Sequence, residues 1–217
     1  MQLDELYAEK LGLLLRLRDE ERVTWEGRFR PPLHGAEANP RPSRDLPVRV
    51  AVGGTPGSVE RAGRLGLPMA LGLIGGSVDH TERLVDVYRK AGRAAGHPDE
   101  KLTVGLTSHF YVGETQEQAL EEFYPFYRRY LAPETNTGRG WRVGRDEMAA
   151  MTARHGALMV GDPGHIIAKI LDLKSEPGVD RFLGQVDIGG MPPEMVRASI
   201  ERFGDLVAPS VRHVLAS

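Results

Sequence analysis

A glycine-rich turn with two hydroxyl side chains is the part of this sequence best suited to bind an anion. It reads Val52-Gly53-Gly54-Thr55-Pro56-Gly57-Ser58 and lies between a short apolar run and a helical pattern. Glycines allow close approach to the backbone, and the free N–H groups and dipole of a helix N-terminus favour negative charge. Thr55 and Ser58 would add hydroxyls, so the turn predicts a phosphate site. An ordinary helix start, with Thr55 as N-cap before Pro56, fits the same residues.

A histidine within a predicted strand is the candidate acid or base. His109 lies in the apolar run Leu102–Val112, and period-2 alternation places it on the same side as Thr107 and Tyr111. Imidazole exchanges protons near neutral pH, so His109 is a candidate catalytic residue; a hydrogen-bonded core histidine is the alternative. The other histidines are scattered without the spacing of a metal site, and we expect no bound metal.

Three other groups of side chains each allow two interpretations. An aromatic cluster on one helix either packs beneath a neighbouring segment or lines a substrate funnel, and a loop rich in arginine and glycine is either a solvated loop, a lid, or a contact for RNA or a cofactor phosphate. Two polar residues of the last strand either bind substrate or form buried hydrogen bonds. The cluster is Phe123, Tyr124, Phe126, Tyr127 and Tyr130; the loop carries Arg139, Trp141, Arg142 and Arg145; the strand residues are Gln185 and Asp187.

The elements that must position these residues alternate between strands and helices. Apolar runs at Val48–Val52, Pro68–Ile74, Leu102–Val112 and Arg181–Ile188 predict strands. Helical patterns follow or precede them at Pro56–Leu65, Asp79–Ala95, Thr115–Tyr130, Pro163–Lys174 and Pro192–Leu215, and an amphipathic helix is predicted at Asp4–Glu21. Strands joined through helices by short connections indicate a parallel sheet, so the fold class is α/β.

Two segments interrupt this alternation. Val23–Asp45 is proline-rich and predicts an irregular connection. Residues 132–161 contain a loop and a short helix at Asp146–Arg154, and we interpret them as an insertion of the kind that forms lids or oligomer contacts.

Composition excludes several classes of protein. The 217 residues include 28 Lys+Arg and 30 Asp+Glu, a net charge of -2, so no overall field favours nucleic acid or an anionic membrane. Cysteine is absent, which removes disulfides and thiol chemistry, and no run of about 18 apolar residues predicts a membrane span. We therefore expect a cytoplasmic protein without nucleic-acid or membrane partners.

The order of the motifs resembles the bacterial-luciferase-like flavin monooxygenases. The resemblance begins with Val52 to Met69, where the strand and hydroxyl-bearing turn are followed by Ala62-Gly63-Arg64-Leu65-Gly66-Leu67-Pro68, and continues through Pro68–Gly76. Val23–Phe29, Val160–Pro163 and Arg181–Gly190 extend it along the chain in the family's order.

This resemblance implies a TIM-like (β/α)₈ barrel that binds FMN, or less often a deazaflavin, and oxidises a small organic substrate. Gly53, Gly54, Thr55 and Ser58 would hold the phosphate, and Gly72 and Leu73 would lie near the flavin ring. The alternative is a non-catalytic flavin-binding or partner subunit.

The sequence departs from the family in its number of strands. We predict four, against eight in the family, so residues 1–217 are interpreted as one luciferase-like domain that forms the C-terminal half-barrel. In the family the other half carries the catalytic histidine. Because exposed sheet edges are avoided in folded proteins, we expect a split or truncated gene product, or closure of the barrel by a second chain or a homo-oligomer.

Overall fold

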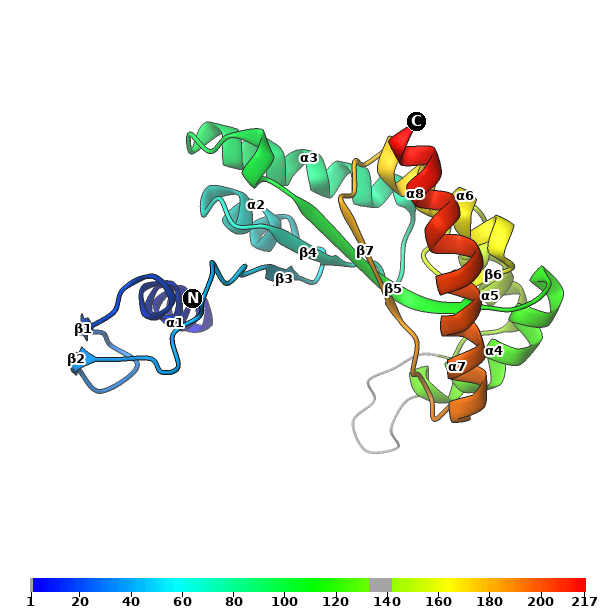
Figure 1. The fold of residues 1–217 in the computed structure, drawn as a ribbon, viewed down its shortest axis with the longest axis horizontal. Coiled ribbons are helices and arrows are strands. Elements are labelled where there is room, and N and C mark those ends of the chain that lie inside the picture. The colour runs from blue at the N-terminus through cyan, green and yellow to red at the C-terminus, as the bar shows by residue number, and fades with distance from the viewer. Residues whose placement is uncertain (1, 133–141) are drawn as a thin grey trace. The chain divides into compact units, whose positions relative to one another are not determined.

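The computed structural model describes residues 2–132 and 142–217, which fold as two compact units, Met1–Val48 and Arg49–Ser217 (Figure 1). In the first unit, α1 (Gln2–Asp19) is followed by β1 (Val23–Trp25) and β2 (Leu33–Ala36), which pair antiparallel. The predicted helix is confirmed. The prediction of an irregular connection over 23–45 is confirmed for residues 26–32 and 37–45 and wrong for the two strands, which at three and four residues are too short to show a clear period-2 pattern.

The N-terminal unit buries Leu13 and Val23 and is also held by polar contacts. The Glu9 carboxylate accepts the backbone N–H groups of Arg28, at 2.8 Å, and Phe29, at 3.1 Å. Arg41 donates to the carbonyl oxygens of Leu17 and Arg18, both at 2.7 Å, and so satisfies the end of α1.

The second unit alternates strands and helices as predicted. Its elements are β3 (Val50–Val52), α2 (Pro56–Arg64), β4 (Met69–Gly72), α3 (Val78–Ala94), the 3₁₀ turn η1 (Asp99–Lys101), β5 (Val104–Val112), α4 (Gln116–Leu131), α5 (Arg145–Thr152), β6 (Met159–Gly161), α6 (Pro163–Ser175), β7 (Arg181–Gln185), α7 (Pro193–Arg202), the π-helical turn η2 (Phe203–Val207) and α8 (Ala208–Ala216).

These strands form one parallel sheet organised around β5. Strand β3 pairs with β4, and β4 pairs with the first half of β5. Strand β7 pairs with Gly105–His109 on the opposite edge, and β6 pairs with Phe110–Val112. The four predicted strands are confirmed. Strand β6 is a fifth, so the interpretation of 132–161 as an insertion outside the sheet is corrected at its last residues.

The first half of the sheet has one covered and one open face. Val52, Leu71 and Leu106 lie in register and are buried on the face covered by α2 and α3 (Figure 1). The other face, here called the open face, carries mostly small side chains and includes one leucine that is 39% exposed. Its register positions are Ala51, Ala70, Gly72, Gly105, Thr107, Leu183 and the exposed Arg181.

The second half of the sheet packs against a separate hydrophobic cluster formed with α4 and α5. Tyr111 on β5 stacks on Phe123 of α4, which in turn stacks on Tyr127, with ring centroids 5.9 Å and 5.4 Å apart. Met148 of α5 and Val160 of β6 belong to the same cluster. Residues of the predicted insertion therefore form a packed layer against β5.

Candidate functional site

The glycine-rich turn leads from the end of β3 into α2 and is open to solvent. Gly53 and Gly57 are exposed, and a Cβ atom on either would meet no atom within 4 Å. Gly54 has φ of +89°, a conformation that residues with side chains adopt only at a cost. The chain therefore presents its backbone to the surface here, with room for a ligand.

The two hydroxyl groups of the turn bind each other and do not cap the helix. Thr55 Oγ1 lies 2.8 Å from Ser58 Oγ, which also donates to the Thr55 carbonyl at 2.9 Å. Thr55 occupies the N-cap position and Pro56 opens the helix, as the alternative interpretation predicts. The capping hydrogen bond is missing, however, since no side chain in the described part of the protein caps α2.

Three other helices, α3, α4 and α6, differ at this point, whereas α5 and α7 also start without a side-chain cap in the described structure. Ser77 accepts the N–H of the third residue of α3, and Thr115 and Asp162 do the same for α4 and α6. The first turn of α2 also carries no acidic residue. The positive end of α2 is thus available to an external anion.

The end of β4 lies beside this turn, because Val52 pairs with Leu71. Gly72 is on the open face opposite Thr107, and the Leu73 N–H donates to the Thr107 carbonyl at 2.8 Å. The Leu73 side chain is buried, so it supports the strand end from the core. The structure thus brings together five predicted cofactor residues, Gly53, Gly54, Thr55, Ser58 and Gly72, while the side chain of Leu73 lies apart from them.

His109 lies further along β5, opposite Gln185 of β7, and is 1% exposed. Its ring meets the rings of Tyr127 and Tyr130 edge-on, at 5.4 Å and 5.3 Å. Both imidazole nitrogens and the Tyr127 hydroxyl lack a hydrogen-bond partner among residues 2–132 and 142–217. Burial lowers the pKa of His109 and raises the pKa of Tyr127, so both are neutral at pH 7. His109 is a core residue, but the predicted hydrogen bond of that alternative is wrong.

Some of the remaining candidate side chains are packed in the core, and others are exposed on the surface. Phe123 and Tyr127 are buried, which confirms packing for that part of the aromatic cluster, while Tyr130 is 47% exposed. Arg145 opens α5 and places its guanidinium 4.7 Å from the Tyr124 ring centroid. Gln185 and Asp187 are exposed, so a buried hydrogen bond for them is wrong. Arg139 and Trp141 lie outside the described residues.

Sequence reasoning missed a buried cation. Lys169 of α6 is 2% exposed and donates to backbone carbonyls at the end of α5. Its signal in the sequence is its position three residues after Ile166 and four before Leu173, on the apolar side of the helix. No group of three histidine or acidic side chains within the described ranges could hold a metal ion.

Comparison with known proteins identifies the family. Residues 4–181 match the family model of the luciferase-like monooxygenases. The chain belongs to this family. No curated protein sequence matches it significantly, and no helix in the described ranges is long and apolar enough to span a membrane.

Solved structures of luciferase-like and related enzymes share the fold. The monooxygenase RslO1 from Streptomyces bottropensis is 26% identical with a TM-score of 0.75, covering 94% of this chain and 60% of that one. The oxygenating constituent of 3,6-diketocamphane monooxygenase from Pseudomonas putida, solved with FMN, is 18% identical with a TM-score of 0.62, covering 96% and 63%. An F420-dependent secondary alcohol dehydrogenase, solved with an F420–acetone adduct, is 18% identical with a TM-score of 0.68, covering 94% and 60%.

The chain therefore spans about 60% of the length of these neighbours. Its parallel sheet corresponds to part of a TIM-like barrel, which confirms the predicted fold class.

Proposed function

We propose that this chain binds FMN and forms the cofactor-binding part of a flavin-dependent oxidoreductase, of the monooxygenase type, that acts on a small organic substrate. The observation that carries the proposal is the uncapped start of α2, where open glycines and two hydroxyls meet beside the end of β4. An anion of phosphate size fits this arrangement because backbone donors, hydroxyls and helix dipole converge on unfilled space.

Different residues would bind the phosphate and the ring of the cofactor. Gly53, Gly54, Thr55 and Ser58 would hold the phosphate, with one oxygen replacing a hydrogen bond between the two hydroxyls. Gly72 would leave room on the open face for the flat ring, and buried Leu73 would fix the strand end behind it. When bound in its reduced form, the flavin supplies the electrons for oxidation chemistry.

His109 is the proposed acid–base residue. Its neutral imidazole can hold a proton on one ring nitrogen and accept one on the other, and neither nitrogen is occupied by a partner in the described structure. Access to a substrate requires movement of the Tyr130 ring, which is half exposed and lies edge-on to the histidine.

A non-catalytic flavin-binding subunit is the second candidate. It is favoured by the coverage of about 60% of the neighbouring enzymes and by the open face of the sheet, which a second copy or another chain would cover. A deazaflavin in place of FMN is the cofactor alternative, since neighbours were solved with either kind.

Titration of FMN and riboflavin by flavin fluorescence tests the proposal. The parent should bind FMN more tightly than riboflavin. Each hydrogen bond to a charged phosphate contributes about 1.5–3 kcal/mol, so the double variant Thr55→Ala/Ser58→Ala should bind FMN at least about 100-fold more weakly. Riboflavin affinity should not change.

Thr115→Ala is the matched control, because it removes a helix-capping hydroxyl far along the chain from the turn. It should leave the affinity for FMN unchanged. Equal affinity of the parent for FMN and riboflavin would contradict the phosphate assignment.

A further inference from the structure

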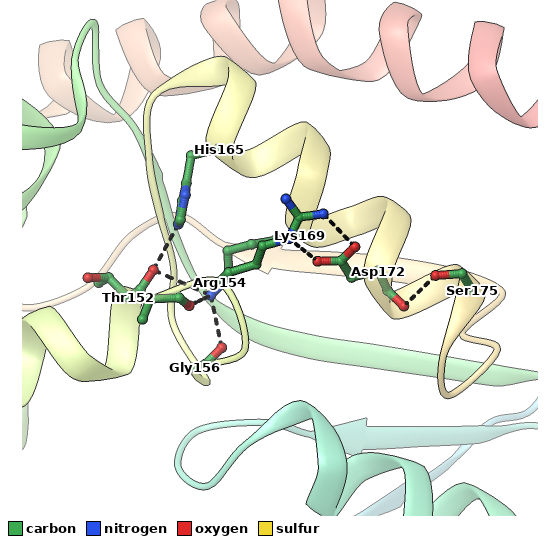
Figure 2. Close-up of polar contacts among 8 residues, drawn as sticks. Thr152, Arg154, Gly156, His165, Lys169, Asp172 and Ser175 are labelled. Atoms are coloured by element: carbon green, nitrogen blue, oxygen red, sulfur yellow. Dashed lines mark hydrogen bonds and ion pairs between the residues drawn. The ribbon is translucent and has the colours of Figure 1, made fainter.

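The buried amine of Lys169 on α6 forms hydrogen bonds with backbone carbonyls at the C-terminal end of α5. Figure 2 shows the side chain reaching from α6 to the last residues of α5 and the turn that follows. Its Nζ donates to three carbonyl oxygens, those of Ala153 at 2.5 Å, Gly156 at 2.9 Å and Thr152 at 3.5 Å. A cation at a helix C-terminus also complements the helix dipole.

The turn that Lys169 holds, residues 153–157, touches the start of α3 and strand β5. The His155 carbonyl accepts the Val78 N–H at 3.1 Å, and Gly156 forms an isolated bridge with Ser77. On the β5 side, Ser108 Oγ donates to the Ala157 carbonyl at 2.7 Å. Ser108 is the residue before His109, and Ser77 caps α3.

Ser77 ends the loop that starts at the candidate ring site. Between Gly72 and Ser77 this loop is glycine-rich, and Ile74, Gly75 and Gly76 are exposed. A Cβ on Gly75 would meet no atom within 4 Å. A loop with so few contacts of its own depends on the groups at its end for a fixed position.

We propose that Lys169 is a positioning residue, which holds the 153–157 turn against Ser77 and Val78 and thereby fixes the loop after β4 that receives the flavin ring. The identity of the ring rests on the proposed function. The mechanical link from Lys169 through His155 and Gly156 to Val78 is independent of it.

The charges around Lys169 are few and are mostly paired. Asp172, on the same helix, binds Arg154 of the turn through two hydrogen bonds of 2.6 Å and 2.8 Å. His165 Nε2 lies 2.8 Å from the Thr152 carbonyl, and His155 is the remaining titratable group of the turn. Burial lowers the pKa of Lys169 to about 8, although Asp172 opposes this shift. The amine is therefore mainly charged at pH 7 and titrates in an accessible range.

Amide NMR of the parent protein tests the link without any ligand. The peptide that joins Gly156 to Ala157 carries a carbonyl bound to Nζ, and Val78 is the next group in the chain of contacts. Between about pH 6.5 and 10 the amide signals of Ala157 and Val78 should titrate together with a midpoint near the pKa of about 8. Absence of this inflection at Val78 would overturn the proposal even if variants failed to fold.

Lys169→Met tests the positioning itself, with Lys174→Met as control. Lys174 lies on the same helix, is exposed and pairs with Asp180 at 3.1 Å. Lys169→Met removes the hydrogen bonds that support the turn, so amide exchange at Val78 should become about tenfold faster or more. Amide exchange at Val78 should be unchanged in Lys174→Met.

Flavin binding then separates positioning from general stability. Lys169→Met should weaken riboflavin binding by about threefold to tenfold and preserve the ratio of FMN to riboflavin affinity, because the phosphate turn is untouched. Unchanged Val78 exchange and riboflavin affinity would overturn the inference. Failure of the parent to bind any flavin would overturn the proposed function, while the Val78 measurements would still decide the role of Lys169.

Discussion

The start of α2 and the end of α5 are opposite solutions to the same problem of unpaired backbone groups. At the start of α2, no side chain in the described structure supplies a cap, and a Cβ atom on Gly53 or Gly57 would meet no atom within 4 Å. At the end of α5, one buried lysine donates to three carbonyls, and contacts with β5 and with the start of α3 hold the turn. The first arrangement leaves hydrogen-bonding capacity for a ligand, and the second uses it for support.

This difference indicates where binding and rigidity lie in the molecule. The open turn is suited to a charged group that arrives from outside, because its hydroxyls bond only to each other and to the Thr55 carbonyl, and no side chain in the described structure caps the helix. The closed turn is suited to fix neighbouring loops, because any movement would leave buried carbonyls without partners. Substitutions that remove the lysine from the closed turn, or add side chains to the open turn, test this difference.

Removal of the lysine should have the largest effect. Lys169→Met keeps the apolar stem but removes the donor shared by three carbonyls. The Thr152 and Ala153 carbonyls keep contacts with His165 Nε2 and the Gly156 N–H, whereas the Gly156 carbonyl loses its bond to Nζ, and a buried unsatisfied group costs about 1–3 kcal/mol. We expect the free energy of unfolding at pH 7 to fall by about 2–4 kcal/mol, measured by urea denaturation. Lys174→Met should change it by less than about 0.5 kcal/mol.

The pH dependence of the free energy of unfolding, compared between the parent and Lys169→Met, tests the role of the lysine independently. The pKa of Lys169 is about 8 in the folded protein and 10.5 for an unperturbed lysine. Between these values the unfolded chain binds the proton and the folded chain does not, so the stability of the parent rises with pH, by about 3 kcal/mol in total. The difference in stability between parent and Lys169→Met should widen accordingly. A constant difference would show that the amine does not titrate in this range.

His109, like the neighbouring Tyr127 hydroxyl, is buried without a hydrogen-bond partner among the described residues. His109→Phe should raise the free energy of unfolding at pH 7 by about 1–2 kcal/mol, because an unsatisfied polar group is removed. Burial lowers the pKa of His109 in the folded state, so the parent should also lose stability as pH falls below the ordinary histidine value, and the variant should not. Thermal unfolding between about pH 5 and 7.5 measures both effects.

His213→Phe, at an exposed position of α8, is the control for that experiment and should show neither change. A lower stability of His109→Phe at pH 7 would mean that the imidazole is hydrogen-bonded in solution.

Two glycines of the open turn should respond in opposite ways. Gly54→Ala forces a side chain into φ of +89° and should cost about 1–2 kcal/mol of stability. Gly57→Ala lies in the first turn of α2 with free space around it, so helix propensity should stabilise it by up to about 1 kcal/mol. Both should weaken FMN binding, because each adds a methyl group next to Thr55 or Ser58, the residues proposed to hold the phosphate. Unchanged FMN affinity in Gly57→Ala would contradict the assignment of the phosphate to this turn.

The sequence predicted the open turn better than the closed one. Gly53, Gly54, Thr55 and Ser58 are contiguous, and their chemistry follows from the strand–turn–helix order alone. The closed turn joins Lys169 to Gly156, and Gly156 to Ser77, over separations that no local pattern records. A lysine among apolar helix positions was its only local sign.

Strand β6 and the hairpin of β1 and β2 were the other elements that the sequence did not predict. Strand β6 has three residues and owes its conformation to pairing with the end of β5. In the hairpin, the short strands β1 and β2 likewise pair with each other. Strand β3 is equally short but was predicted, because it lies in the apolar run Val48–Val52 that ends at the glycine-rich turn. The longer runs, such as Leu102–Val112, predicted β5 to within two residues because their length and apolar content are typical of a buried strand.

The most direct test of the account is a comparison of amide chemical shifts in the parent protein with FMN and with riboflavin added. Binding of the phosphate at the start of α2 predicts that the backbone N–H signals of Gly57 and Ser58 shift strongly with FMN and remain near their free positions with riboflavin. Equal shifts with both ligands, or FMN-specific shifts elsewhere while Gly57 and Ser58 do not respond, would contradict the assignment of this turn as the phosphate site.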